Sequence, residues 1–323
     1  MNWRRLTIDD LSAGLAICPD CVGAELVGFD RAVAAWRQLT NMPSFGGAIV
    51  EDAAGRVVGI GAAVFVSAAF ATGEIAYPQP GLNARIIKSV DSGRSVVLSQ
   101  EQLQAGNAFG GLDLVVLCAA RSKEMVDASA LSEVESTIGI AFFRLFLGWR
   151  FRQMMREGVG RDTLAHIESQ RVFGTRDNFE AFRQRNPDAP WSHDRALFVC
   201  TKEFALAFPG SVAAILFGYR EPILRLTRHD QHLLDAALAG ATDDELARQL
   251  KLKTPTVKKR WATVFHHVSE VKPDIFPSHV TLSDSRSRGP QKRHLLLDYL
   301  RQHPEELRPT VSGRRRLPLA RSV

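Results

Sequence analysis

The sequence predicts two kinds of fold in one chain: an α/β (or α+β) domain over residues 1–218, and an all-α domain that begins at residue 219. Strand-like and helix-like patterns alternate in the first part of the chain, whereas short amphipathic helices with cap residues follow from residue 226. The charge changes as well. Residues 221–323 contain 19 Lys and Arg against 12 Asp and Glu, whereas the remainder of the chain contains 22 against 23.

The overall composition is that of a globular protein large enough for two domains. The chain has 323 residues, of which 45% are hydrophobic and 24% are charged. No apolar run follows the cations at the N-terminus, and the longest uncharged stretch, residues 57–73, is short for a membrane span. We therefore expect a cytoplasmic protein without a membrane partner. The basic C-terminal third predicts either a polyanionic partner or a solvated basic surface.

The first domain is expected to mix helices and strands. An acidic residue near the start of a helix suits the helix dipole, as in DDLSAGLAI. Phe29, Val33, Trp36 and Leu39 have helical spacing, and two apolar runs around EDAAGR indicate a hairpin. The expected elements are a strand at 3–7, helices at 9–17 and 29–39, a hairpin within 47–66, strands at 94–98 and 112–119, one or two buried helices within 135–155, and a strand at 195–201.

Cys18 and Cys21 form a lone C-x-x-C motif, CPDC. A zinc site would need a second pair of ligands at matching spacing, and none follows. A thioredoxin-like motif would follow a strand and open a helix, whereas this motif follows a predicted helix. We therefore expect ordinary reduced thiols in a turn and no metal site.

The order of elements over residues 3–200 resembles that of acyl-CoA N-acyltransferases of the GNAT family, mainly through WRRLTIDDLSAGLAI and AIVEDAAGRVVGIGAAV. The resemblance implies N-acyl transfer from acyl-CoA, with a loop of the form [RQ]-x-x-G-x-[GA] that opens a helix and binds the pyrophosphate. The nearest match is 136–141, which makes Gly139 and Ala141 the cofactor-binding candidates. This match lacks the Arg or Gln, and Glu135 adds a negative charge beside it.

We therefore expect a degenerate acyltransferase-like domain that senses a ligand or holds two protomers together. It is expected to have no catalytic residues, no enzymatic activity and no resident cofactor. An active N-acyltransferase that uses acyl-CoA, with a basic domain appended, is the alternative.

The second domain is predicted from its helix boundaries. Thr227 with an acid three residues later, and Thr242 with Glu245, resemble capping boxes, and Gly240 is placed to end the helix between them. Pro255 suits the first position of a third helix, for which Thr254 would be the cap.

The third helix, from residue 255 to about residue 267, has an apolar face and a cationic face. Val257, Trp261 and Val264 fall together, whereas Lys258 and Lys259 fall elsewhere. A helix that packs through one face and presents donors on the other can lie in the major groove of DNA. The alternative is a solvated helical hairpin used only for packing.

This region resembles the LuxR-type helix-turn-helix domain of bacterial regulators. The matching positions are Leu226, Thr227, Gly240, Thr242, Glu245, Leu246, Ala247, Leu250, Thr256, Val257 and Lys258. The departures are His229, Asp230, Lys253 and Arg260. The resemblance implies a sequence-specific transcriptional regulator that binds double-stranded DNA through residues 219–270. The candidate DNA-binding residues are Thr242, Lys253, Thr254, Thr256, Lys258, Lys259 and Arg260.

Residues 271–323 are expected to form a linker, a short helix over 290–303 and a basic tail. The single leucine stripe of that helix favours docking on the helix-turn-helix over pairing with a second copy. Because one helix-turn-helix reads few base pairs, we expect a homodimer held mainly by the near-neutral first domain, with half-sites about 10 bp apart.

Overall fold

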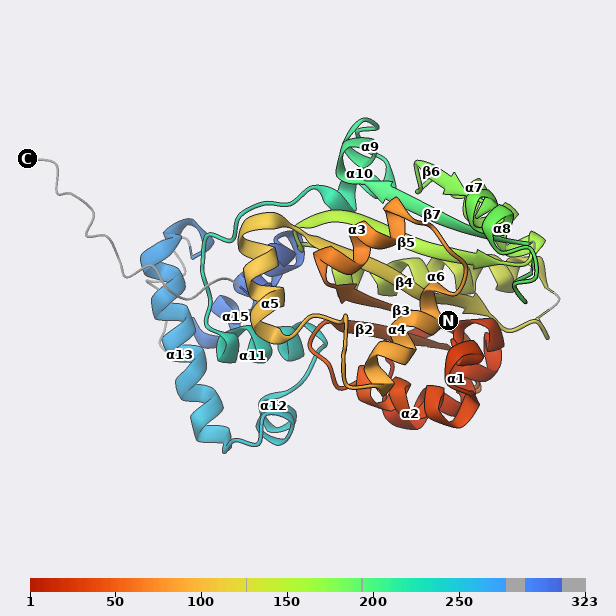
Figure 1. Ribbon diagram of the computed structural model, residues 1–323. Coiled ribbons are helices and arrows are strands. Elements are labelled where there is room, and N and C mark those ends of the chain that lie inside the picture. Colours follow the sequence, from red (N-terminus) through yellow and green to blue (C-terminus); the bar gives the residue numbers. More distant parts are fainter. Residues whose placement is uncertain (126, 193, 277–287, 310–323) are drawn as a thin grey trace, which may run out of the picture. The chain divides into compact units, whose positions relative to one another are not determined.

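The computed structural model describes residues 1–125, 127–192, 194–276 and 288–309. The chain divides into an N-terminal unit, Met1–Gly218, and a C-terminal unit, Tyr219–Val323 (Figure 1). Among the described residues, no helix is both long enough and apolar enough to cross a membrane.

The N-terminal unit is built on one mixed sheet of seven strands, and the expected α/β class is confirmed. The strand order is β1-β2-β3-β4-β5-β7-β6. Neighbouring strands are antiparallel except β4 and β5, which are parallel and joined by a helical crossover. The strands are β1 (Asn2–Arg5), β2 (Phe45–Glu51), β3 (Val57–Val66), β4 (Leu112–Arg121), β5 (Phe151–Val159), β6 (Thr175–Asp177) and β7 (Arg195–Thr201).

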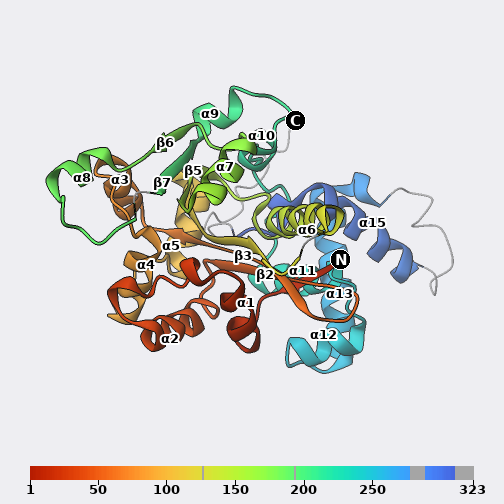
Figure 2. The ribbon, with the colours of Figure 1, turned by 90° about the vertical axis from the view of Figure 1, so that its right-hand side faces the viewer.

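Helices cover both faces of this sheet (Figure 2). One hydrophobic cluster packs α1 (Leu11–Ile17), α2 (Phe29–Leu39) and α4 (Leu82–Asp91) on one face. A second cluster packs α5 (Gln100–Ala105), α6 (Ala128–Phe146) and α10 (Val212–Phe217) on the opposite face. The remaining helices of this unit are α3 (Ala68–Ala76), α7 (Arg161–Ser169), α8 (Glu180–Arg185) and α9 (Lys202–Leu206).

The packing of α2 shows how sequence periodicity becomes burial. Trp36 and Leu39 are fully buried, and the Trp36 indole Nε1 donates a hydrogen bond to the Val22 carbonyl at 3.1 Å. Phe29 is on the same predicted stripe, but 62% of it is exposed. Phe29 is the first residue of α2 and lies outside the hydrophobic cluster that buries the rest of the stripe.

Two expected elements of the N-terminal unit are wrong. Residues 94–98 do not form a strand; Val97 makes a single bridge to Val66. The apolar run within 135–155 is also only partly helical, because α6 ends at Phe146 and β5 begins at Phe151. Gly148 separates them with a φ of 87°, a backbone conformation that other residues rarely adopt.

The C-terminal unit is all-helical in its described residues. It contains α11 (Arg228–Leu238), α12 (Asp243–Gln249), α13 (Thr254–Val271) and α15 (Arg288–Gln302). Thr227 and Thr242 cap α11 and α12, as their spacing predicts: each hydroxyl accepts a hydrogen bond from the backbone N–H three residues on. Gly240 follows α11 with a φ of 92°.

The expected start of α13 is wrong by one residue. Thr254 is the first residue of the helix, and the N-cap is Lys253, which makes no capping hydrogen bond through its side chain. The Thr254 hydroxyl instead donates to the Asp244 carboxylate at 2.9 Å and so joins the start of α13 to α12. Pro255 therefore occupies the second helical position.

The predicted boundary at residue 270, between the helix-turn-helix and the linker, does not divide the hydrophobic core, because one cluster contains residues from both sides of it. Leu296, Leu297 and Leu300 of α15 are buried in the same cluster as Trp261 of α13. Beyond α15, the buried Glu306 carboxylate accepts hydrogen bonds from the backbone N–H groups of residues 223–224. The helix expected over 290–303 thus docks on the other helices. Residues 310–323, which include the predicted basic tail, and residues 277–287 of the linker lie outside the described residues.

Candidate functional site

The outer face of α13 presents cationic and small polar side chains over an apolar back. Val257, Trp261, Val264 and Val268 are buried against the rest of the C-terminal unit. The predicted DNA-binding residues that are exposed near the start of the helix are Lys253, Thr256, Lys258 and Lys259. We call these four residues the cationic face. Since basic side chains at an exposed helix start can meet phosphates, its geometry suits a polyanion.

The other three predicted DNA-binding residues are placed differently. The Thr242 hydroxyl donates to Glu245 at 2.8 Å within its capping box, and the Thr254 hydroxyl donates to Asp244. Hydrogen bonds from Thr242, backbone first, lower the pKa of the Glu245 carboxyl. Arg260 is half-buried. The two hydroxyls therefore already have partners within the unit, although Thr242 remains exposed.

α15 supports this surface from behind. The Arg293 guanidinium lies 4.7 Å from the centre of the Trp261 ring, and it pairs with Asp243 at 2.9 Å. The Phe265 ring stacks on the Trp261 ring, and the two ring centres are 5.5 Å apart. One arginine thus links the first turn of α12 to the indole at the back of α13. Sequence periodicity could not identify this residue, because it comes from a separate helix.

The predicted phosphate loop at 136–141 is wrong. Gly139 and Ala141 lie inside α6, where backbone N–H groups are used in the helix. The start of α6 is also acidic, because the Asp127 carboxylate accepts a hydrogen bond from the Ala130 N–H at 2.8 Å. Glu135 pairs with Arg121 at 2.7 Å. These residues do not form a phosphate cradle at a helix start.

A second candidate site lies where the two parallel strands separate. The pairing of β4 with β5 ends at Val116 and Arg156, and the register between β3 and β4 skips Leu117, which indicates a β-bulge. A pocket opens beside the C-terminal ends of both strands; its strand residues are Leu117, Cys118, Ala119, Ala120, Arg156, Glu157 and Val159. In open α/β sheets, this edge of a parallel pair is where ligands bind.

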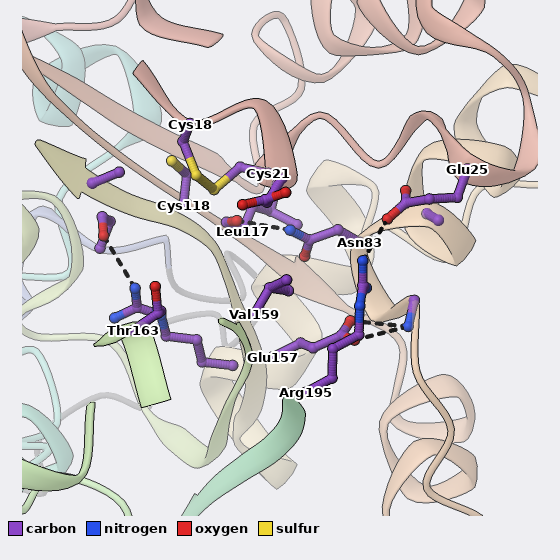
Figure 3. A pocket seen from close by; sticks show the side chains of 16 residues that line it. Cys18, Cys21, Glu25, Asn83, Leu117, Cys118, Glu157, Val159, Thr163 and Arg195 are labelled. Carbon is purple, nitrogen blue, oxygen red and sulfur yellow. Dashed lines mark hydrogen bonds and ion pairs between the residues drawn. A yellow bond between two sulfur atoms is a disulfide. The ribbon is translucent and has the colours of Figure 1, made fainter. Parts of the chain in front are cut away.

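Side chains complete the hydrogen bonding around this pocket (Figure 3). The Asn83 amide donates to the Leu117 carbonyl at 2.8 Å, and the Arg156 guanidinium donates to the Ala119 carbonyl at 3.0 Å. Among the residues that the structure describes, the buried Asn83 Oδ1 atom has no hydrogen-bond partner, so it can accept a hydrogen bond from a ligand.

Glu157 has a structural position in the same wall. Its carboxylate accepts hydrogen bonds from the backbone N–H groups of Gly81 and Leu82, at 2.9 and 2.7 Å, where α4 begins. Arg195 pairs with Glu157 at 3.2 Å and with Glu25 at 3.1 Å. Because these partners occupy the Glu157 oxygens, the carboxylate is poorly placed to act as a general base.

The cysteines differ from the sequence prediction. Cys18 and Cys21 lie in a turn after α1, as expected, but they form a disulfide and not a pair of reduced thiols. Cys118 lies beside them in the pocket (Figure 3). Burial raises the pKa of the Cys118 thiol to about 12. No sequence spacing relates Cys118 to the C-x-x-C motif, because the sheet alone brings them together.

The cavity between these residues is small. Its volume is about 70 Å³, well below the roughly 300–1,000 Å³ of typical small-molecule sites. As it stands, it has room for a small group or an ion and not for a whole cofactor.

No protein-family model matches the chain, and no curated protein matches it. Among solved structures, the chain is similar to FeeM, an N-acyl amino acid synthase from uncultured soil microbes, with 9% identity and a TM-score of 0.34 over 62% of this chain and 95% of that one. It is also similar to Arabidopsis thaliana NAA60 in complex with a bisubstrate analogue, with 11% identity and a TM-score of 0.34 over 62% of this chain and 97% of that one.

Proposed function

We propose that the protein is a DNA-binding transcriptional regulator whose C-terminal unit contacts double-stranded DNA through α13. The observation that carries this proposal is the cationic face of α13 on a helix whose back is fully packed. A helix used only for packing also has a solvated polar face, but cations at its start oppose the helix dipole, so their presence there favours an anionic partner. A helix that enters a major groove needs them to contact phosphates and base edges.

The residues of the cationic face are assigned to phosphates or to base edges according to their positions along α13. Thr256, Lys258 and Lys259 are all exposed. Lys259 is assigned to phosphates alone, whereas Thr256 and Lys258, which lie nearer the start of the helix, are assigned to base edges as well. Phosphate contacts make affinity depend on salt without depending on sequence, and base contacts do the reverse. The two roles can therefore be separated by experiment.

The test measures binding of the full-length protein to double-stranded DNA by fluorescence anisotropy over a range of salt concentrations, after selection of preferred sites from genomic fragments. Lys259→Ala should weaken binding to every sequence and reduce the salt slope by about one. Lys88→Ala, at an exposed lysine of α4, is the matched control and should change neither. An unchanged slope for Lys259→Ala, or no preferred site for the wild type, would refute the proposal.

Full-length protein is proposed to bind as a homodimer. The near-neutral N-terminal unit can associate without the repulsion expected between two basic units. Two copies would read two half-sites with centres roughly 10 bp apart. Light scattering combined with footprinting tests this arrangement, and a monomer that protects a single half-site would contradict it.

Acyl transfer by the N-terminal unit is the second candidate function. The pocket between β4 and β5 favours it, because the bulge at Leu117 and the free Asn83 Oδ1 atom offer a polar site at the separated strand ends. The reaction class comes from the family resemblance of the sequence. The occupied Glu157 carboxylate and the Asp127 carboxylate at the start of α6 oppose it, since neither a free base nor a phosphate cradle is present at these positions.

Release of free coenzyme A from acetyl-CoA, with amino acids as acceptors, tests this second candidate. Ala120→Phe would fill the pocket and abolish any turnover that takes place there. Gly139→Trp is the matched control, because Gly139 faces open space on α6. Turnover that Ala120→Phe abolishes and Gly139→Trp preserves would establish the enzyme function.

A further inference from the structure

Two cysteines of one turn and a third from a distant strand meet in the pocket between β4 and β5 (Figure 3). The sulfur atoms of Cys18, Cys21 and Cys118 all lie within 4.8 Å of one another. Across residues 1–125, 127–192, 194–276 and 288–309, no other group of three or more His, Cys, Asp and Glu side chains brings its ligand atoms together in this way. This cluster is separate from the cationic face, and it shares its pocket with the second candidate function.

We propose that Cys18, Cys21 and Cys118, once the Cys18–Cys21 disulfide is reduced, bind one thiophilic metal ion such as Zn²⁺. Two cysteines separated by two residues have the spacing of zinc ligands, and the fold supplies the third sulfur from β4. With Zn–S bonds of about 2.3 Å, tetrahedral ligands would stand roughly 3.8 Å apart. The Cys118 sulfur therefore needs to approach the other two by at most about one ångström. The Cys18 and Cys21 sulfurs, bonded at about 2.05 Å in a disulfide, must move apart by roughly 1.7 Å after reduction.

The charge of the surroundings fits such a site. A divalent ion with three thiolates has a net charge of −1, and Arg156 lines the same pocket with only 8% of its surface exposed. Within the part of the chain that the structure describes, Arg156 forms no ion pair with a carboxylate, and its guanidinium donates to the Ala119 carbonyl. A buried charge without a counter-charge is costly, so an anionic metal–thiolate group beside Arg156 would offset that cost.

The coordination number predicts the class of site. Zinc in proteins usually has four ligands, and sites with three protein ligands keep the fourth position for water or a substrate. Here the fourth position would face the small cavity, which has room for one small ligand. We therefore assign an open site and not a closed structural one.

Metal binding requires a change of oxidation state that must be supplied from outside. A dithiol or phosphine reductant gives two electrons to the Cys18–Cys21 disulfide; with two protons from solvent, two thiols form and the reductant is oxidised. Binding of the ion then converts three thiols to thiolates and releases three protons. The oxidised protein should therefore bind no metal at this site.

The test uses full-length protein reduced with a phosphine under anaerobic conditions and titrated with Co²⁺. One ion per chain should bind, with thiolate-to-cobalt charge-transfer absorption that Zn²⁺ abolishes by displacement. Cys118→Ala should lower the affinity by at least about tenfold, since even residues that only orient a ligand contribute that much. Cys200→Ala is the matched control, because Cys200 is also a buried free cysteine but lies outside the cluster.

A second measurement does not depend on the folding of a variant. X-ray absorption at the zinc edge of the loaded wild-type protein should show three sulfur neighbours at about 2.3 Å. Two sulfur neighbours or fewer would overturn the proposal. So would the absence of charge-transfer absorption in the reduced wild type, or an affinity that Cys118→Ala leaves unchanged.

Discussion

Replacing Trp261 by alanine tests whether the indole belongs to the core of the C-terminal unit or to its DNA-binding surface. Only 5% of the surface of Trp261 is exposed, and its side chain packs against Phe265 and Arg293. Burying a tryptophan removes about 150–250 Å² from water, which at about 25 cal/mol per Å² corresponds to roughly 4–6 kcal/mol. Alanine keeps part of this, and measured large-to-small replacements cost about 3–5 kcal/mol.

The Nε1 atom of Trp261 allows a sharper comparison. Within the described part of the chain it is buried without a hydrogen-bond partner, so the wild-type residue already carries an unsatisfied donor there. Trp261→Phe removes that donor together with part of the ring and should cost only about 1–2 kcal/mol. Trp261→Ala should cost about 3–5 kcal/mol, which leaves the two variants well separated.

Hydrogen exchange read by mass spectrometry in the full-length protein gives the free energy of opening for amides in α11, α12 and α13. Trp261→Ala should lower the protection of all three helices together, because they share one core. DNA affinity should fall only as far as the folded fraction falls. Unchanged protection with a selective loss of DNA affinity would show that Trp261 is a contact residue, and the assignment of the buried face would be wrong.

Three further changes test the folded units by chemical denaturation. Arg4 beside Asp10 holds the pKa of the Asp10 carboxyl at about 2, below its ordinary value near 3.8. The ion pair therefore stabilises the folded state fully above pH 4, and this stabilisation is lost as the pH falls towards 2. Asp10→Asn should lower the free energy of unfolding by about 1–2 kcal/mol at neutral pH and should make it depend less on pH in this range. Glu157→Gln should destabilise the N-terminal unit by about 2–4 kcal/mol, because it removes the charge that pairs with Arg195 and leaves one acceptor oxygen for two backbone N–H groups. The half-exposed Glu168→Gln should cost under about 1 kcal/mol. Arg293→Met should cost the C-terminal unit about 1 kcal/mol through the lost contact with Trp261 and the lost pair with Asp243.

Local signals predicted local structure well. The caps at Thr227 and Thr242 act within three residues of the helix that they begin, so the sequence alone was sufficient for α11 and α12. The start of α13 was displaced because a tertiary contact, the bond from Thr254 to Asp244, replaced the expected cap. The run within 135–155 was assigned entirely to helix because a short buried strand has the same apolar appearance as a buried helix.

The pocket could not be predicted, because its residues are brought together only by the sheet. Cys18 and Cys118 are one hundred positions apart, and neither shows which strand the other lies beside. The loop proposed at Gly139 came from a family pattern applied to a stretch that is the middle of a helix. Side chains that complete the pocket, such as Asn83 and Arg195, had no spacing signal at all. The cationic face, in contrast, could be predicted, because its residues lie close together in sequence and the helical spacing of the apolar residues beside them indicates which side of α13 is exposed.

The order of the strands also bears on how the protein is made. β5 stands between β4, with which it runs parallel, and β7, which is the last strand of the unit to be synthesised. Until Arg195–Thr201 leaves the ribosome, one edge of β5 is unpaired and open to other chains. Domains fold as units from the N-terminal end of a growing chain. The pocket, which needs Arg195, is therefore completed late in the folding of the first unit.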